Sequence, residues 1–335
     1  MKVKIFKLIF VLLIAFISPV FANSITEEMG TGGLIYVYSP DVKITKKELF
    51  ISRYEIRVEY EFFNKSEKDI TSIVAFPMPS VTGNPYEQNS IPSPELDNIL
   101  NFSVVVDGLP ITPNLEQKAY ALGLDVTNIL KKAKVSLLPF AQRTIKDLEL
   151  LPKKATKGKY SISYLQRRGM VENIPFNNGI KEVERAIPIW TLKSSFWWKM
   201  KFRANQTIKI SYSYEPSRGS STFVTFVNED GTKGLNYDKY KEKYCIDDAF
   251  INEVKQDMQK GVNLFETYIS YVLVNPQNWY GTIDNFYLNI DKIESVNSIS
   301  FCADKVKRVG LNIYEINKKD FDPEKDLHIL IMRRF

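Results

Sequence analysis

Histidine is almost absent from this chain and cysteine is rare, which removes several kinds of site from consideration. One histidine, His328, and two cysteines, Cys245 and Cys302, occur in 335 residues. A tetrahedral zinc site needs four ligands, mostly nitrogen or sulfur. These three side chains cannot supply such a site, so we expect no bound metal and no cofactor.

The common signatures of nucleophilic and nucleotide chemistry are also missing. The sequence has no Gly-x-Ser-x-Gly elbow and no Ser-x-x-Lys pair, and it has no Walker loop for phosphates. His328 lies within an expected strand, where a structural role is commoner than a catalytic one. We therefore expect no catalytic residue and a non-enzymatic protein.

Paired carboxylates leave one enzymatic alternative open, a hydrolase of envelope polysaccharide. The acids of a glycosidase come from distant strands, so their spacing along the sequence is not diagnostic. The candidate pairs are Glu59 with Glu61 and Asp247 with Asp248. Solvent exposure explains the first pair more simply, and helix capping explains the second.

Long apolar runs are confined to the start of the chain. Three lysines precede an apolar segment that ends near Ile17, and Val20 and Ala22 fit a cleavage site after Ala22. This pattern predicts a signal peptide of residues 1–22 and export to the periplasm or the medium; an uncleaved N-terminal anchor is the alternative. No later segment approaches the roughly 18 apolar residues of a membrane helix, so we expect no transmembrane segment after cleavage.

The charge is too small to favour nucleic acid as a partner. The formal net charge is +6, and removal of the three leader lysines lowers it to +3. A protein or an envelope polysaccharide is the expected partner, with binding to an envelope component or an extracellular protein as the expected role. The sequence leaves the oligomeric state open.

The two cysteines are expected to form one disulfide bond. Exported proteins fold in an oxidising compartment, where a single pair of cysteines is usually joined. A bond between Cys245 and Cys302 would close a loop of about 57 residues and contribute roughly 4 kcal/mol in the chain-entropy account. Two separate buried thiols are the alternative.

Alternation of apolar and polar residues predicts a mainly β, α+β fold in two domains. Residues 23–235 are expected to form an antiparallel β-sandwich with a helical insertion at about 115–150, where apolar residues recur every three or four positions. Asp125 is the expected cap within this insertion. Residues 236–335 are expected to form a smaller domain.

In the smaller domain, one helix should pack on an antiparallel sheet. Asp247 or Asp248 would cap this helix and Gly261 would end it. The residues before it, from Tyr237 to Tyr244, are interpreted as a solvated connector. The disulfide would then hold the helix against its sheet.

The stretch EYEFFNKSEKDITSIVAFPMPS, residues 59–80, predicts a β-hairpin that must end abruptly. Residues 64–69 form a polar turn, in which Asn64 can bond the backbone. Pro77 and Pro79 then remove two backbone donors, so strand pairing stops there. The apolar side chains that we expect to be buried are Phe62, Ile73 and Phe76.

Four tryptophans raise a second non-enzymatic alternative, a lectin-like module. They are Trp190, Trp197, Trp198 and Trp279. An exposed, coplanar pair could stack on a sugar ring, although packing in the core is the commoner role. A cavity lined by two carboxylates would instead favour the hydrolase, and closed aromatics beside an apolar groove would favour a protein binder.

The N-terminal part resembles a known sandwich domain. Tyr60-x-Phe62-x-Asn64-x-Ser66 followed by Phe76-Pro77-Met78-Pro79 is similar to the opening of a vault/inter-alpha-trypsin domain, over about residues 50–150. In that family the sandwich is often joined to a von Willebrand type A domain. The Asp-x-Ser-x-Ser metal motif of that second domain is absent here.

A second resemblance covers nearly all of the expected mature chain. The chain is similar to an uncharacterised family of exported bacterial proteins, known only as a domain of unknown function. The resemblance implies fold and export but no activity. The segments that carry it are Gly32-Gly33-Leu34, Phe62-x-Asn64, Phe76-Pro77-Met78-Pro79, Tyr244-Cys245-Ile246-Asp247, Asn278-Trp279-x-Gly281, Ile290-Asp291-Lys292, Ser300-Phe301-Cys302 and Phe321-x-Pro323.

Overall fold

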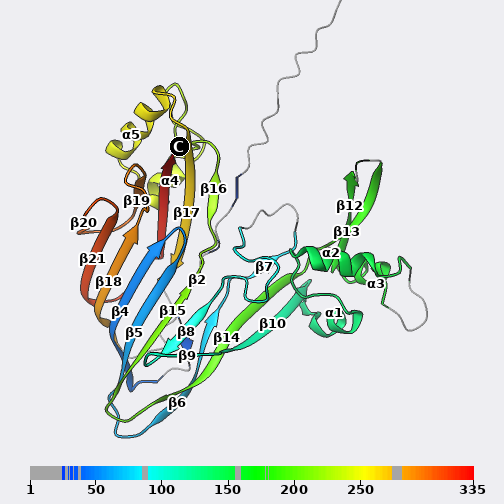
Figure 1. Ribbon diagram of the computed structural model, residues 1–335, viewed down its shortest axis with the longest axis horizontal. Coiled ribbons are helices and arrows are strands. Elements are labelled where there is room, and N and C mark those ends of the chain that lie inside the picture. Colours follow the sequence, from blue (N-terminus) through cyan, green and yellow to red (C-terminus); the bar gives the residue numbers. More distant parts are fainter. Residues whose placement is uncertain are drawn as a thin grey trace, which may run out of the picture.

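The computed structural model shows a β-rich molecule made of three large sheets and one projecting hairpin (Figure 1). The expected leader, residues 1–22, lies outside the residues that it describes. Among the described residues, no helix is long and apolar enough to cross a membrane. The described residues are 25–26, 29, 31–32, 34–36, 39–84, 90–154, 160–177, 179, 181–273 and 281–335.

The first sheet has eight strands in the order β20-β21-β18-β4-β5-β15-β8-β9. Strand β18 runs parallel to β4, and the other neighbours are antiparallel. Alternate side chains of its strands are buried, which is the period-two pattern seen in the sequence. The bounds are β4 (Val42–Ser52), β5 (Ile56–Asn64), β8 (Ser103–Val106), β9 (Leu109–Ile111), β15 (Thr207–Tyr214), β18 (Ile283–Asp291), β20 (Lys307–Val309) and β21 (Ile313–Phe321).

The second sheet packs against the first and completes an antiparallel sandwich. Its order is β11-β10-β14-β6-β3, and β7 also pairs with β14. Between the two sheets, the ring of Phe102 stacks on Phe76 at 4.3 Å and on Phe196 at 4.9 Å. The bounds are β3 (Ile35–Tyr36), β6 (Ile70–Pro77), β7 (Val81–Thr82), β10 (Asn114–Ala121), β11 (Leu124–Asp125) and β14 (Thr191–Phe202). The predicted mainly β fold with a sandwich is confirmed.

The predicted hairpin is wrong, because β5 and β6 belong to different sheets. Strand β5 pairs with β4 and β15, whereas β6 pairs with β14 and β3. The polar turn between them is therefore an arch that crosses from one layer to the other. A second arch, between β14 and β15, lies against it: Asn64 N donates to Gln206 O (3.2 Å) and Asn205 N donates to Ser66 O (3.1 Å).

The Asn64 side chain bonds the backbone of its turn, as the sequence predicted, although this turn is an arch and not a hairpin. Its side chain is fully buried. The amide nitrogen donates to Lys68 O (2.8 Å) and to Phe202 O (3.0 Å), and the amide oxygen accepts from Ser66 N (3.0 Å). One side chain thus closes its own arch and ties it to the second one.

Two of the three apolar side chains that we expected to be buried are buried. Phe62 and Phe76 lie in the core, but Ile73 is 45% exposed. Ile73 and Phe76 are three positions apart in β6, and residues an odd number apart point to opposite faces of a strand. The expectation for Ile73 is therefore wrong, since Phe76 already occupies the inner face.

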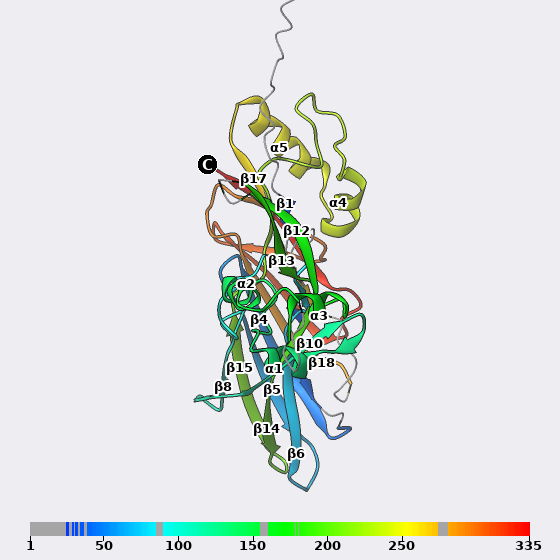
Figure 2. The same cartoon turned by 90° about the vertical axis from the view of Figure 1, so that its right-hand side faces the viewer.

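The third sheet carries two helices on one of its faces (Figures 1 and 2). Its order is β1-β16-β17-β22-β19, and β2 pairs in parallel with β17. Phe250 and Val254 of α5 pack with Leu330 of β22 in a separate core cluster. The bounds are β1 (Ile25–Thr26), β2 (Thr31–Gly32), β16 (Gly219–Ser221), α4 (Tyr237–Tyr244), α5 (Asp248–Gln259), β17 (Leu264–Val272), β19 (Ser298–Phe301) and β22 (Leu327–Arg334).

Strands from both sides of residue 235 share two sheets. Strand β18 pairs with β4 in the first sheet, and β16 pairs with β17 in the third. One core cluster contains residues from Leu34 to Ile331. The boundary expected between residues 23–235 and 236–335 therefore does not coincide with a boundary between sheets, because pairing joins segments that are distant in sequence.

Helices do follow β10, but the expected insertion begins too early. Residues 114–121 form β10, which pairs with β14, so the first part of the predicted block is strand. Asp125 Oδ1 accepts from Thr127 N (2.9 Å) at the start of the first helix. The bounds of the insertion are α1 (Thr127–Ala133), α2 (Gln142–Glu149), α3 (Ile162–Gln166), β12 (Val171–Asn177) and β13 (Glu182–Pro188).

The helix expected after Asp247 is confirmed as α5. The residues before it, which we interpreted as a solvated connector, form a helix instead. Asp247 Oδ1 accepts from Phe250 N (2.7 Å), so Asp247 is the cap of α5. The residues before it form α4, in which Tyr240 and Tyr244 are buried. The many lysines of this segment suggested exposure on all sides, but they lie on the outer face of a helix whose tyrosines pack on the sheet.

Candidate functional site

Two adjoining hollows lie on the outer face of the first sheet. Their volumes are about 260 Å³ and 210 Å³, and Glu48 and Glu59 line both of them. These side chains point away from the core because they alternate along β4 and β5 with buried residues such as Leu49 and Val58. We call this region the outer-face groove and define it by Lys46, Glu48, Phe50, Arg57, Glu59, Glu61, Lys209 and Asn289.

Charges of both signs alternate across the outer-face groove. Lys46 Nζ lies 2.5 Å from Glu48 Oε1, and Lys209 Nζ lies 3.0 Å from Glu61 Oε1. The hydrogen bond to Glu48 raises the pKa of Lys46 above its ordinary value. Glu48 and Glu59 face each other directly across the β4–β5 ladder, a juxtaposition of like charges that costs stability.

Aromatic rings lie beside these charges. The Arg57 guanidinium is 4.9 Å from the centre of the Phe50 ring, and Lys46 Nζ is 5.7 Å from that of Tyr287. Such cation–π contacts hold long side chains flat against a sheet. The groove therefore offers a polar surface with rings and with charges of both signs.

The predicted pair Glu59 and Glu61 lies in this groove, together with Glu48, which the sequence reading missed. A glycosidase places two carboxyl groups on either side of the scissile bond, usually within a concave pocket that encloses the substrate. Here the side chains of Glu48 and Glu61 are 39% and 30% exposed, on an open sheet face. The arrangement suits contact with a partner better than hydrolysis.

The second pair of carboxylates has a structural explanation. Asp247 caps α5 through Phe250 N, and both Asp247 and Asp248 are exposed at the helix start. Carboxylates at a helix N-terminus complement the positive end of the helix dipole. This agrees with the capping interpretation.

The described tryptophans do not form an exposed platform. Trp190 is fully buried and its Nε1 donates to Leu137 O (2.8 Å). Trp198 is 5% exposed, and Trp197 is half-buried on the other face of the same strand. Trp279 lies outside the described residues. No two of the three described rings can therefore present a coplanar pair to a sugar.

A buried carboxyl group lies beneath α4, and the sequence reading missed it. Glu266 of β17 is fully buried and accepts hydrogen bonds from Tyr240 OH (2.9 Å), Tyr268 OH and Thr225 N (2.7 Å). Burial raises the pKa of Glu266, although the donors around it act in the opposite direction. A single acid within the apolar strand LFETYISYV was the signal that could have identified it.

This network holds the layers together rather than forming an open site. Perturbed carboxyl groups often mark functional sites, but neither hollow of the outer-face groove includes Glu266. Its partners come from the segment before α4, from α4 itself and from β17. Glu266 therefore anchors the helical cover to the third sheet.

The lone histidine also has a local partner. Ser270 and His328 face each other across the β17–β22 ladder, and Ser270 Oγ lies 2.7 Å from His328 Nδ1. Among the described residues, no group of three or more His, Cys, Asp or Glu could hold a metal ion.

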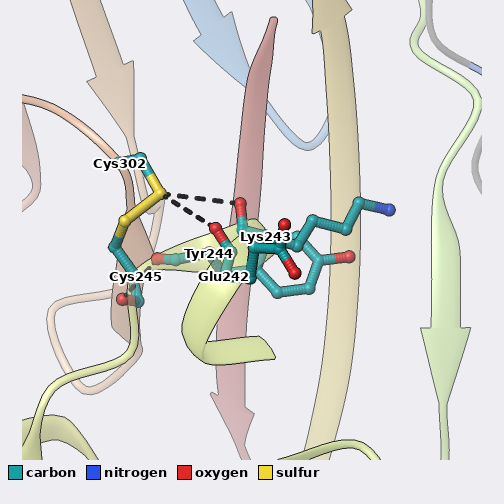
Figure 3. Close-up of a disulfide and its surroundings, with 6 residues drawn as sticks. Glu242, Lys243, Tyr244, Cys245 and Cys302 are labelled. Carbon is teal, nitrogen blue, oxygen red and sulfur yellow. Dashed lines mark hydrogen bonds between the residues drawn. A yellow bond between two sulfur atoms is a disulfide. The ribbon is translucent and has the colours of Figure 1, made fainter. Parts of the chain in front are cut away.

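The predicted disulfide bond between Cys245 and Cys302 is confirmed, with an S–S distance of 2.08 Å (Figure 3). Cys245 follows α4 in a left-handed conformation, with φ of 53°, and Cys302 follows β19. Cys302 Sγ lies 3.6 Å from Glu242 O at the helix end. The bond therefore fixes the end of α4 to the edge of the third sheet.

The fold defines a mainly β protein in which the largest sheet of a sandwich also packs against a helix-covered third sheet. The chain belongs to the family described as Domain of unknown function (DUF4424), whose model matches residues 22–330. This confirms the second resemblance drawn from the sequence. The likeness to the vault/inter-alpha-trypsin domain stays a prediction.

Two solved structures are similar to this chain at low sequence identity. One is a "putative nutrient binding protein" from Legionella pneumophila, with 13% identity, a TM-score of 0.46 and coverage of 92% of this chain and 72% of the other. The other is a two-domain M1 zinc metallopeptidase, with 6% identity, a TM-score of 0.22 and coverage of 88% and 43%. No curated protein matches the sequence.

Proposed function

We propose that this protein is exported and that it acts without catalysis, binding an envelope component or an extracellular protein through the outer-face groove. The observation that carries this proposal is the pair of adjoining hollows that share Glu48 and Glu59. Charges of both signs around them favour a partner of complementary charge pattern, which supplies specificity and orientation. The disulfide supports an oxidising compartment.

A protein partner fits this groove better than a sugar chain does. The rings of Phe50 and Tyr287 are covered by the cations of Arg57 and Lys46, so they are not free to stack on a sugar. Protein interfaces, by contrast, use arginine and aromatic side chains at their centres. The hydrolase remains the second candidate, because two carboxylates line one hollow and three line the other.

The test is site-specific photo-crosslinking in the native compartment. A crosslinker at Phe50 should capture one defined partner, and Glu59→Arg should reduce that capture at least tenfold by reversing a central charge. Glu116→Arg is the matched control, because Glu116 is a half-exposed strand residue of the second sheet that pairs with a lysine, Lys118 (2.8 Å). Equal capture in both charge-reversal variants would contradict the proposal.

The hydrolase is distinguished by the chemistry of its product. Incubation of the protein with isolated envelope polysaccharide should release no reducing ends. If reducing ends appear with the wild type and disappear with both Glu48→Gln and Glu59→Gln, the groove is a catalytic site and the binding role is wrong.

A further inference from the structure

Two arginines lie over one tyrosine where the first sheet meets the third, and a third arginine lies near enough to feel their charges. Arg53 and Tyr54 form the short loop between β4 and β5, and Ser52 Oγ holds this loop by accepting from Tyr54 N (3.2 Å) and Glu55 N (3.0 Å). Arg218 directly precedes β16, and Arg333 lies near the end of β22. We call these three arginines with Tyr54 the arginine cluster.

Two of the three guanidinium groups lie over the Tyr54 ring. Those of Arg53 and Arg218 are 4.5 Å and 5.9 Å from the centre of the Tyr54 ring. Arg333 is half-buried, and its guanidinium is 4.5 Å from the centre of the Phe335 ring. Burial lowers the pKa of Arg333, and the positive charges of Arg53 and Arg218 lower it further.

The cluster has more positive charge than its acidic neighbours balance. Glu294 Oε1 lies 2.9 Å from Arg53 Nη2. In the part of the chain that the structure describes, neither Arg218 nor Arg333 forms a salt bridge. Three positive charges against one negative charge leave an excess of two, which repels itself in the absence of an anion.

Arg53 also has an unused donor in a buried position. Its side chain is 10% exposed, and its Nε–H is buried without a hydrogen-bond partner. Its Nη2 already contacts Tyr54 OH and Glu294. A buried donor that lacks an acceptor costs free energy, more so when it belongs to a charged group.

We propose that the arginine cluster binds a phosphate group. Guanidinium groups match the geometry of phosphate oxygens through paired hydrogen bonds. A phosphate monoester carries about −1.5 to −2 charges at pH 7, which balances the excess of two. Tyr54, which is 52% exposed, supplies a ring against which the rest of the ligand can lie.

This site is independent of the outer-face groove, since none of its three arginines lines either hollow. The phosphate could belong to a soluble phosphate compound or to a lipid headgroup. Both present non-bridging phosphate oxygens to the arginines, and the experiment separates the two sources.

Thermal unfolding of the full mature protein in inorganic phosphate tests the site. Phosphate should raise the melting temperature of the wild type more than sodium chloride at equal ionic strength. Arg218→Gln and Arg333→Gln should each weaken the apparent affinity for phosphate at least tenfold. Arg143→Gln, whose side chain is 44% exposed on α2 and pairs with Asp97, is the matched control and should respond as the wild type does.

A low-salt measurement without phosphate separates binding from a structural role. Arg218→Gln should be at least as stable as the wild type there, because it removes a repelling charge. If Arg218→Gln melts lower and its phosphate response is unchanged, the arginines support the fold and the proposal is overturned.

Vesicles distinguish the source of the phosphate. Sedimentation with phosphatidylglycerol vesicles but not with phosphatidylcholine vesicles, lost in Arg218→Gln, would assign the site to anionic headgroups. A response to inorganic phosphate alone would assign it to soluble compounds. No response to either probe would refute the site.

Discussion

Glu266 shows at the level of single residues how this fold accommodates a buried acid. Two tyrosines and a threonine surround its carboxyl group, so every nearby donor points at it. Buried polar groups are tolerated only when they are hydrogen-bonded. Because burial shifts the pKa of Glu266, the free energy of unfolding depends on whether this carboxyl group is protonated.

We predict that the stabilisation due to Glu266 declines as the pH rises. Its pKa in the folded protein lies above the ordinary value of 4.5. The folded state therefore binds the proton more tightly than the unfolded state does, and the stabilisation is full below the unfolded pKa and is lost as the pH rises through the folded pKa. Relative to Glu266→Gln, the wild type should lose free energy of unfolding as the pH increases above about 4.5.

Denaturant unfolding at a series of pH values measures this difference. Glu229→Gln is the control, because Glu229 is exposed; its curve should run parallel to that of the wild type. If the wild type instead gains free energy of unfolding relative to Glu266→Gln as the pH rises, the carboxylate form is the stabilising one and the prediction is wrong.

Phe76 is the residue on which the sandwich core depends most clearly. It is fully buried and contacts the rings of Phe102, Tyr212 and Tyr214. Phe76→Ala should therefore cost about 3–5 kcal/mol of stability. Lys65→Ala and Lys68→Ala, on the exposed arch, should each cost within about 0.5 kcal/mol, as measured by denaturant unfolding. Full stability of Phe76→Ala would contradict the packing argument.

At the scale of elements, the two stacked arches explain why a polar turn was mistaken for a hairpin. Asn64 satisfies backbone groups on β14 as well as in its own turn. Local sequence specifies that the chain turns there and that β6 stops at its prolines. It does not specify whether the next strand returns to the same sheet, because the competing partners lie far away in the chain.

The disulfide bond is a second link between elements, because it fixes the end of α4 to β19. We predict that Cys302→Ser lowers the free energy of unfolding by about 2–5 kcal/mol. The loss should be largest in the helical cover, where hydrogen exchange of the α4 amides should accelerate. Labelling of the unfolded, unreduced wild type should find no free thiol, and two reactive thiols would contradict the bond.

The whole molecule is held together by its largest sheet, which packs against both the second sheet and the third. Tyr212 of β15 and Tyr271 of β17 approach with their hydroxyl oxygens 3.2 Å apart, and Lys47 lies 5.3 Å from the ring of Tyr271. Burial raises the pKa of both tyrosines. Their contact joins the first sheet to the third within one core.

At this scale we predict that the exported protein begins at Asn23. The three lysines, the apolar segment and Ala22 form the pattern of a cleaved leader. N-terminal sequencing of the protein from its host should read Asn-Ser-Ile. An intact Met1 would leave the uncleaved anchor as the correct interpretation.

Much of this protein was determined by short-range patterns in its sequence. Alternation predicted most of the strands, Asp247 predicted the start of α5, and the lone pair of cysteines predicted the disulfide, because each depends on near neighbours or on composition. The spacing of three and four that predicted a helix at residues 115–121 fitted a strand equally well, since a short apolar run satisfies both periods.

Only the tertiary structure decided which strands pair and which side chains meet. Strand β4 pairs with β18, more than 200 residues later in the chain, and this pairing unites segments that looked like separate domains. Arg53, Arg218 and Arg333 come together for the same reason. Backbone hydrogen bonds between strands are alike whatever the sequence. Which strands pair therefore depends on how whole layers pack, and no local stretch of sequence specifies it.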